Sequence, residues 1–312
     1  MTESSLDYNF SLTHKSQALQ ARAKLIQSIR LFFIHHGFLE IETPLRIPSP
    51  APEEHIEAIP SGNWFLQTSP ELCMKRLLAA GYQRIFQISK CFRAAERGNK
   101  HLPEFTMLEW YAAGFDYHQL MDQCQALLIA ALKDMGHNKD IVWQNKKINL
   151  VSLWERITVA EAFLKYAPIT LEEALVQDKF DDILVDLIEP QLGINRPTFI
   201  YDYPAKLAAL SKIKMNDPTV AERFELYIGG LELANGFSEL IDANEQRQRF
   251  EDALRLRARK NWACYTMPEK FLHALQKMPP CAGVALGIDR LVMFMIDAGK
   301  IDDVVAFTPE ML

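Results

Sequence analysis

Two stretches of the sequence, residues 84–92 and 104–111, constrain the fold of this chain more than any other feature. Successive side chains of a β-strand point to opposite faces, and in each stretch this alternation separates a mainly apolar set from a set of chemically active side chains. A polar loop rich in charge, residues 94–102, joins the two stretches. The pair therefore predicts two neighbouring strands of one sheet.

The rest of the sequence predicts helices around such a sheet. Apolar residues recur at helical spacing over residues 18–33 and 120–132, with glycines placed to end both helices. Thr158-x-x-Glu161 and Thr170-x-x-Glu173 have the pattern of capping boxes. Further strands are predicted at 38–42 and 198–203, and a hairpin at 222–240 with its turn at Gly229-Gly230. A helix is predicted at 244–261, and the start of another within 283–298. We predict one α+β domain over residues 1–312, with an antiparallel sheet flanked by helices.

One face of the two central strands carries groups that bind ligands. Alternation places Arg93 on one strand beside Phe105, Glu109 and Tyr111 on the other, if the two faces coincide. An arginine, an aromatic plate, a carboxylate and a phenol could together bind an anion, a base and a cation. An exposed polar sheet face explains the same pattern about equally well. The joining loop adds Glu96 and His101, but charged loops are usually only solvated.

A second group of polar residues lies on the predicted 222–240 hairpin. It holds three carboxylates and an amide: Glu225, Glu232, Asn235 and Glu239. Bringing several carboxylates together is costly unless a cation neutralises them, so the hairpin predicts a magnesium ion, a substrate ammonium group, or both. Parity places Glu232 opposite the face of Asn235, so a shared site requires a β-bulge near residues 234–236. A salt-bridged surface hairpin is the alternative.

The segment Gly283–Leu291 is the third candidate. Its glycines allow close approach of the backbone to a ligand, and Arg290 in the first turn of a helix is suited to phosphate. Spacing of the type Gly-x-x-x-Gly also recurs in plain helix–sheet packing.

Taken together and in their order along the chain, these elements resemble the three signature motifs of class II aminoacyl-tRNA synthetases. The helix and strand ending at Pro44 resemble motif 1, residues 92–111 resemble motif 2, and Gly283–Leu291 resembles motif 3. Within that class the lysine branch is most similar, through Thr68-Ser-Pro-Glu71, His101-x-Pro-Glu-Phe-Thr-Met-Leu-Glu and Glu-Leu-Ala-Asn235-Gly-Phe-Ser-Glu239. The resemblance implies a class II fold, a homodimer through the motif 1 helix and Pro44, and ATP with Mg²⁺ as reactants.

The resemblance also implies roles for individual residues. Arg93 and Arg290 would be catalytic, holding the α- and γ-phosphates, with His101 on the γ-phosphate and Phe105 stacked on adenine. Glu225 and Glu232 would bind magnesium, and Glu232 would also belong to the ATP site. The amino acid would contact Ser69, Glu71, Tyr111, Asn235, Phe237, Glu239 and Ala285. Among these, Asn235 would meet the carboxylate, Glu71 the amine near it, and Glu239 with Tyr111 the ε-ammonium.

Two departures from lysyl-tRNA synthetases refine the expected function. Their motif 2 reads Phe-Arg-x-Glu, whereas here Phe92-Arg93-Ala-Ala-Glu96 has the carboxylate one place later, so Glu96 is the candidate for the adenine contact. Ala285 stands where those enzymes carry glycine. In having alanine at position 285 and serine at position 69, the sequence resembles the elongation factor P lysine ligase family.

The acceptor expected from this resemblance is a protein. Lysyl-tRNA synthetases carry an N-terminal OB-fold domain that reads the anticodon, whereas the motif 1 helix here begins almost at the start of the sequence. The formal net charge of −6 also argues mildly against a large nucleic-acid footprint. We therefore expect adenylation of (R)-β-lysine or lysine and transfer to a lysine ε-amine of elongation factor P, with tRNA disfavoured.

Two other functions stay open at this point: a truncated lysyl-tRNA synthetase that acylates tRNA, and a non-catalytic regulatory paralogue. The five cysteines are scattered, and no apolar stretch is long enough to cross a bilayer. We therefore expect a cytoplasmic protein that does not use a membrane.

Overall fold

The computed structural model describes residues 12–54 and 56–312 as an α+β protein built on one large sheet. Nine strands form this sheet in the order β1-β5-β6-β14-β13-β12-β10-β9, with β11 paired to β12. The pairs β1/β5 and β9/β10 are parallel, so the predicted antiparallel sheet is in fact mixed. The other pairs in the sheet are antiparallel.

The strands of the large sheet are β1 (Leu39–Glu40), β5 (Arg84–Phe92), β6 (Glu104–Ala113), β9 (Glu155–Thr158), β10 (Thr198–Pro204), β11 (Ile213–Lys214), β12 (Asp217–Ile228), β13 (Leu231–Ser238) and β14 (Cys281–Gly287). Two small sheets hold β2 (Arg46–Ile47), β3 (Pro60–Ser61) and β4 (Trp64–Leu66), and β7 (Asp140–Trp143) with β8 (Lys146–Asn149). The α-helices are α2 (Ser16–His35), α3 (Glu71–Ala79), α4 (Tyr117–Asp134), α5 (Val159–Tyr166), α6 (Leu171–Val176), α7 (Phe180–Ile183), α8 (Ala243–Arg259), α9 (Glu269–Leu275) and α10 (Ile288–Met295).

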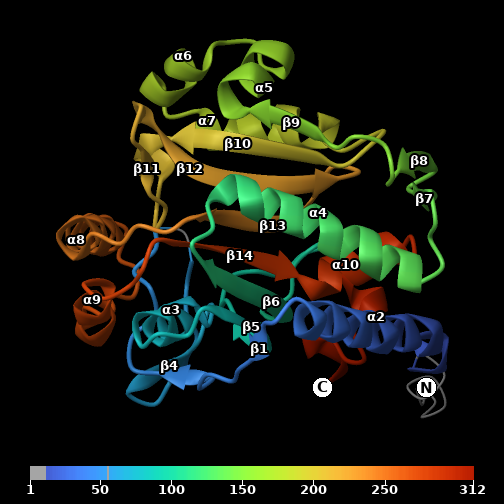
Figure 1. Ribbon diagram of the computed structural model, residues 1–312, viewed down its shortest axis with the longest axis horizontal. Coiled ribbons are helices and arrows are strands. Elements are labelled where there is room, and N and C mark those ends of the chain that lie inside the picture. The colour runs from blue at the N-terminus through green and yellow to red at the C-terminus, as the bar shows by residue number, and fades with distance from the viewer. Residues whose placement is uncertain (1–11, 55) are drawn as a thin grey trace, which may run out of the picture.

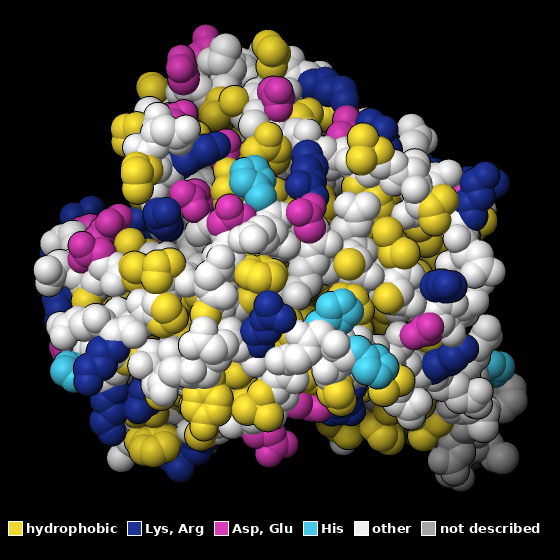
Figure 2. Space-filling view, viewed as in Figure 1, with side chains coloured by type: hydrophobic (Ala, Val, Ile, Leu, Met, Phe, Trp, Pro, Cys, Tyr) yellow, Lys and Arg dark blue, Asp and Glu magenta, His cyan; other side chains and the backbone are white. Residues whose placement is uncertain are grey.

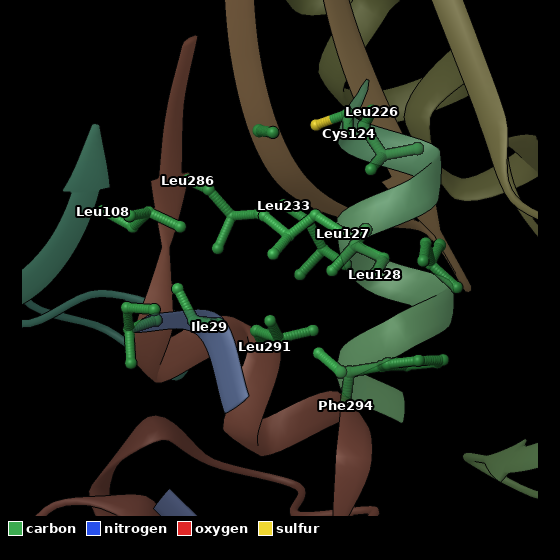
Figure 3. Close-up of a cluster of buried hydrophobic side chains, with 14 of the residues drawn as sticks. Ile29, Leu108, Cys124, Leu127, Leu128, Leu226, Leu233, Leu286, Leu291 and Phe294 are labelled. Carbon is green, nitrogen blue, oxygen red and sulfur yellow. The ribbon is translucent and has the colours of Figure 1, made fainter. Parts of the chain in front are cut away.

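Helices α2, α4 and α10 cover one face of the sheet (Figure 1). Their apolar faces meet one register row of the strands, Leu108, Leu286, Ala234 and Leu226, which pair across β6, β14, β13 and β12. Figure 3 shows Leu127 and Leu128 of α4 pointing toward Leu233 and Leu286. Because these side chains are buried against the helices, this face of the sheet is core. On the outer surface of the same side, Lys and Arg lie among acidic and apolar side chains (Figure 2).

Local sequence signals explain where the main elements begin and end. Both predicted capping boxes are present, because Thr158 accepts a hydrogen bond from the Glu161 amide and Thr170 from that of Glu173. Gly229 and Gly230 both have positive φ, at 64° and 74°, as a tight turn between twisted strands requires. These predictions are confirmed, whereas the β7–β8 hairpin and helix α9 were not predicted.

Candidate active site

A cavity of about 740 Å³ opens on the sheet face opposite α4. Its wall is a second register row, in which Glu109 of β6, Ala285 of β14, Asn235 of β13 and Glu225 of β12 are successive partners. Because these residues alternate with the buried row, the packing of α4 on one face fixes them toward the cavity on the other. The predicted coincidence of the two polar strand faces is therefore observed, and the exposed-face alternative is wrong.

Nearly all of the predicted site residues line this single cavity: Ser69, Glu71, Arg93, Glu96, His101, Phe105, Tyr111, Glu225, Glu232, Asn235, Phe237, Ala285 and Arg290. The exception is Glu239, whose side chain is 0% exposed and whose Oε1 lies 2.8 Å from the position that a Cβ on the cavity-lining Gly283 would occupy. The structure thus joins three segments that are far apart in the sequence. Glu239 adjoins this cavity through the strand position of Gly283.

The β-bulge that the hairpin required is present, but at a different position. Leu226 pairs with Ala234 while Tyr227 pairs with Glu232, so Leu233 is the extra residue of β13. The extra residue turns Glu232 to the face of Asn235 and Glu225. The bulge thus lies one residue before the predicted range of 234–236, at a residue that packs into the core.

Gly283 makes room for the aromatic part of the wall. A Cβ on Gly283 would lie 2.2 Å from Cε1 of Tyr111 and 2.8 Å from Oε1 of Glu239. The Tyr111 ring therefore crosses directly over the glycine, next to Phe237 in the adjacent register position. A side chain at this position would displace the ring that closes this end of the cavity.

The other end of the cavity presents cationic and aromatic groups. The Arg93 guanidinium lies 5.1 Å from the centroid of the Phe105 ring and 3.2 Å from Oε1 of Glu96. Arg290 contacts Glu232 at 3.0 Å and Nε2 of His101 at 2.5 Å. Burial and the neighbouring Arg290 lower the pKa of His101, so its ring is neutral beside the arginine. This end is suited to a polyanion carrying a flat base.

Glu225 and Glu232 are the candidate metal ligands. Glu225 accepts hydrogen bonds from Arg223 at 2.7 Å, from the Tyr227 hydroxyl at 2.7 Å and from Asn235 at 3.1 Å. Burial raises the pKa of Glu225, and although Arg223 opposes this, the nearby Glu232 carboxylate raises it further. The buried Oδ1 of Asn235 has no hydrogen-bond partner in the described chain.

These donors fit a magnesium ion shared with phosphate. Magnesium is commonly held by one or two carboxylates together with substrate phosphate oxygens. Within residues 12–54 and 56–312 no group of three or more His, Cys, Asp and Glu side chains has a metal-binding arrangement. The pair would therefore need oxygens from the ligand to complete a coordination shell.

Carboxylates dominate the end of the cavity near Tyr111. Glu109 is buried on the wall, where it accepts hydrogen bonds from Ser69 at 2.5 Å and from Tyr111 at 2.9 Å. Burial, with the Glu71 carboxylate nearby, raises the pKa of Glu109 to about 8. Glu239 forms an ion pair with Lys75 at 2.5 Å, and Lys75 also pairs with Glu71. Burial raises the pKa of Glu239 to about 8, although Lys75 opposes that rise.

The site also holds several charged residues to which the sequence assigned no specific role. Strand alternation predicts the correct face for Glu109, but the family resemblance gave this carboxylate no substrate contact. Lys75 lies four residues after Glu71, one turn along the same helix, and this spacing could have indicated the pair. Glu53 lines the cavity; burial, with Glu71 nearby, raises its pKa to about 7 against the opposing charges of Arg93 and Arg223. Glu189, whose carboxylate contacts Tyr227 at 3.0 Å, comes from a segment with no motif at all.

Comparison with known proteins places this arrangement in context. A family model described as tRNA synthetases class II (D, K and N) matches residues 3–311. Curated relatives named elongation factor P–(R)-β-lysine ligase include that of Hamiltonella defensa, 40% identical over 94% of this chain and 95% of its own. The protein of that name from Haemophilus influenzae strain PittGG is 42% identical over 93% and 94% of the two chains. The one from Histophilus somni strain 2336 is 41% identical over 97% and 98%.

Proposed function

This chain belongs to the class II tRNA synthetase family of the D, K and N type, and from that premise we propose that it is an elongation factor P–(R)-β-lysine ligase. It would activate (R)-β-lysine or lysine with ATP and transfer the acyl group to a lysine ε-amine of elongation factor P. The observation that carries the proposal is one cavity with a polyanion site at one end and an acidic site at the other. Identity near 40% along almost the whole of relatives bearing that name supports the protein acceptor.

Adenylation is the first step that this geometry would perform. A carboxylate oxygen of the amino acid attacks the α-phosphorus of ATP, and the bond from that phosphorus to the bridging oxygen of pyrophosphate breaks. Because the attacking carboxylate is ionised at neutral pH, no general base is needed. Arg93 and Arg290 would hold and neutralise the phosphates, while Asn235 on the wall would orient the attacking carboxylate. Catalysis is then mainly positioning and charge stabilisation.

Glu225 and Glu232 would hold Mg²⁺, which supplies charge neutralisation to the triphosphate when bound. Glu225 lines the cavity and is held there by hydrogen bonds from Arg223, Tyr227 and Asn235. Glu232 would have to release Arg290, which could then turn to the phosphates.

The amino acid would place its ammonium groups against the acidic wall. Glu71 and Glu109 both line the cavity, and Tyr111 lies between Glu109 and the Gly283 backbone. We assign direct contacts to these two carboxylates, with the buried Glu239 beside them at Gly283. Transfer would follow when a neutral acceptor amine attacks the acyl carbon of the adenylate, AMP leaves, and the amine nitrogen loses a proton.

The proposal is tested by two assays on the purified enzyme. The first measures ATP–pyrophosphate exchange with α-lysine and with (R)-β-lysine in parallel, and the second offers elongation factor P and tRNA(Lys) as acceptors. We expect exchange with at least one isomer and label on elongation factor P alone. Label on tRNA alone would instead identify a truncated lysyl-tRNA synthetase, and zero exchange with every isomer a regulatory paralogue.

Ala285 offers a prediction about the choice between the two isomers. Ala285 pairs in register with Asn235, so if Asn235 orients the substrate carboxylate, the Ala285 methyl group would lie beside the carbon that follows that carboxylate. That carbon bears an ammonium group in α-lysine but only hydrogens in (R)-β-lysine. Ala285→Gly should therefore raise the ratio of kcat/KM for α-lysine to that for (R)-β-lysine by ~10-fold or more. A ratio that stays the same or falls would remove Ala285 from the specificity pocket.

We also propose that the protein is a homodimer through α2 and the segment ending at Pro44. Leu31, Ile34 and Leu39 are 53%, 56% and 50% exposed on this surface, which is unusual for a cluster of large apolar side chains. Ile34→Glu should shift the molar mass measured by light scattering from two chains to one. The matched change Leu164→Glu, at an 84% exposed position on α5, should leave the mass unchanged. A wild-type mass of one chain would contradict the proposal.

No helix in the described part of the chain is long and apolar enough to cross a bilayer. We propose a cytoplasmic location, where an acceptor of the translation machinery would be found.

A further inference from the structure

Glu53 is a carboxylate of the cavity that the proposed adenylation step does not use. It lies on a segment, residues 52–54 and 56–58, that we call the strap. Pro52, Glu54 and Ile56 of the strap line the cavity together with Glu53. Among the described residues, the Glu53 carboxylate has no ion-pair or hydrogen-bond partner. Its carboxylate is therefore available to a ligand.

The strap is held in place by Arg257, a fully buried arginine on α8. Its Nη1 donates a hydrogen bond to the carbonyl oxygen of Glu53 at 2.8 Å, and its Nη2 donates to Oε2 of Glu57 at 2.7 Å. The amide of Ala94, the residue after Arg93, donates to the carbonyl oxygen of Glu57 at 2.8 Å. The backbone of Glu53 is thus fixed relative to the strand end that carries Arg93.

The charges that act on Glu53 come from both ends of the cavity. The charged and titratable side chains that face it belong to four other parts of the chain: Arg93 after β5, Arg223 on β12, Glu71 and Lys75 on α3, and Tyr265 after α8. Arg93 and Arg223 lie at the phosphate end of the cavity, whereas Glu71 lies at the acidic end. Glu53 is therefore near the junction of the two ends.

An aminoacyl-adenylate would place its reactive carbon at this junction. Its phosphate belongs with Arg93 and its ammonium groups belong with the acidic wall, so the acyl carbon that joins them lies between. The acceptor lysine that attacks this carbon is mostly protonated at neutral pH, because the ordinary pKa of its amine is about 10.4. Transfer therefore needs a group that accepts a proton.

Other carboxylates of the cavity already have partners. Those given a role above are paired or hydrogen-bonded within the chain: Glu71, Glu96, Glu109, Glu225 and Glu232. Arg93 pairs with Glu96 and Arg223 with Glu225, so neither arginine needs Glu53 as its counter-ion. Glu53 thus differs from them in being free to take up a proton.

We propose that Glu53 is the catalytic base of acyl transfer, the group that accepts the proton of the attacking acceptor amine. The nitrogen lone pair forms the bond to the acyl carbon, an N–H bond breaks, and the proton moves to the Glu53 carboxylate. The bond from the acyl carbon to the phosphate oxygen then breaks, and AMP leaves with that electron pair. This inference rests on the proposed function and adds to it the group that makes a protein amine reactive.

Glu53→Gln tests this role because it separates transfer from adenylation. Lysine-dependent ATP–pyrophosphate exchange should stay within ~3-fold of the wild type, since adenylation needs no base. Single-turnover transfer from the preformed adenylate to elongation factor P should slow by ~100-fold or more, as expected for loss of a general base. Hydroxylamine, a small amine that is largely uncharged at neutral pH, should capture the adenylate equally well from both enzymes.

The pH dependence of transfer identifies the group that takes the proton. Burial, with Glu71 nearby, raises the pKa of Glu53 to about 7, so the carboxylate is ionised above pH 7 and protonated below it. Ionisation of the acceptor amine cancels in the ratio of the wild-type transfer rate to that of Glu53→Gln. This ratio should be constant above pH 7 and should fall toward one by about tenfold for each pH unit below it.

Glu54→Gln is the matched control, because it makes the same change at the exposed neighbouring position of the strap. Its transfer rate should stay within ~3-fold of the wild type, as a carboxylate that takes no proton in the reaction requires. A loss of transfer in Glu54→Gln without a loss in Glu53→Gln would assign the base to the wrong residue.

Three further results would overturn the proposal. Unchanged transfer in Glu53→Gln would mean that the proton goes elsewhere, and a rate ratio independent of pH would mean that Glu53 does not titrate in the reaction. Exchange and transfer that fall together, with an unchanged thermal melt, would place Glu53 in substrate binding instead. Failure of the proposed function is distinct, since the wild-type enzyme would then show no exchange or no label on elongation factor P.

Discussion

Replacing Arg93 with glutamine is expected to lower lysine-dependent ATP–pyrophosphate exchange by ~1,000-fold, because glutamine cannot supply the positive charge that the α-phosphate gains from arginine. The guanidinium lies over the Phe105 ring at 5.1 Å, within the cavity, and the carboxylate that it contacts in the free enzyme, Glu96, is 3.2 Å away. Loss of charge at this position acts on the transition state more than on the ground state. The decrease should therefore appear mainly in kcat, with a smaller rise in the KM for ATP.

Arg97 provides a matched control within the same loop. Its guanidinium pairs with Asp302 and Glu310 outside the cavity, at 2.9 Å and 2.8 Å. Because exposed ion pairs contribute little, Arg97→Gln should retain exchange within about 3-fold of the wild type. If Arg93→Gln kept exchange within tenfold of Arg97→Gln, Arg93 would not be at the reacting phosphate.

Glu109→Gln should raise the KM for lysine by ~100-fold or more, because the variant removes one of the two wall carboxylates that face the substrate. The amide keeps the size of the side chain; its oxygen can accept a hydrogen bond from one of the Ser69 and Tyr111 hydroxyls while its NH2 donates to the other, so the cavity wall should remain in place. The KM for ATP should not change. Glu104→Gln, at an exposed position on the same strand, is the control.

The pH dependence of lysine binding gives an independent test of Glu109. Its pKa of about 8 means that in the empty cavity the carboxyl is mostly protonated below pH 8. An ammonium group binds the ionised form, so the affinity for lysine should fall by about tenfold for each pH unit below 8 and protons should be released on binding. Calorimetry in buffers of different ionisation enthalpy measures both effects. In Glu109→Gln the slope should be shallower, and an unaltered slope would assign the titration to another group.

Most of the site residues that the sequence predicts follow from the alternation of side chains along the strands. Strand β5 begins and ends where the sequence indicates, at Arg84 and Phe92, and the two-faced pattern put Arg93, Phe105 and Tyr111 on the side where the cavity opens. Such a pattern is local, because the period of two depends only on the backbone of one strand. The same holds for the Gly229-Gly230 turn, which needs positive φ at both residues.

Local sequence patterns could not predict the features that depend on contacts between distant segments. Parity predicts that Asn235, Phe237 and Glu239 share a face, and Oε1 of Glu239 indeed lies 2.8 Å from the Cβ position of Gly283, the register partner of Phe237. There it meets Lys75 of α3, a residue that no motif joined to it. The partner of a buried charge depends on how distant segments pack together, and the periodicity of a single segment does not predict it.

The sequence by itself determined the class of fold, the two arginines that we propose bind phosphate, and the two faces of the central strands. Only the tertiary structure decided that the extra residue of β13 is Leu233, that Glu109 lines the cavity, and that Lys75 pairs with Glu239 and Glu71 at the acidic end. The physical reason is that face alternation arises within one strand, whereas register, bulge position and charge pairing arise from how separate segments pack against one another.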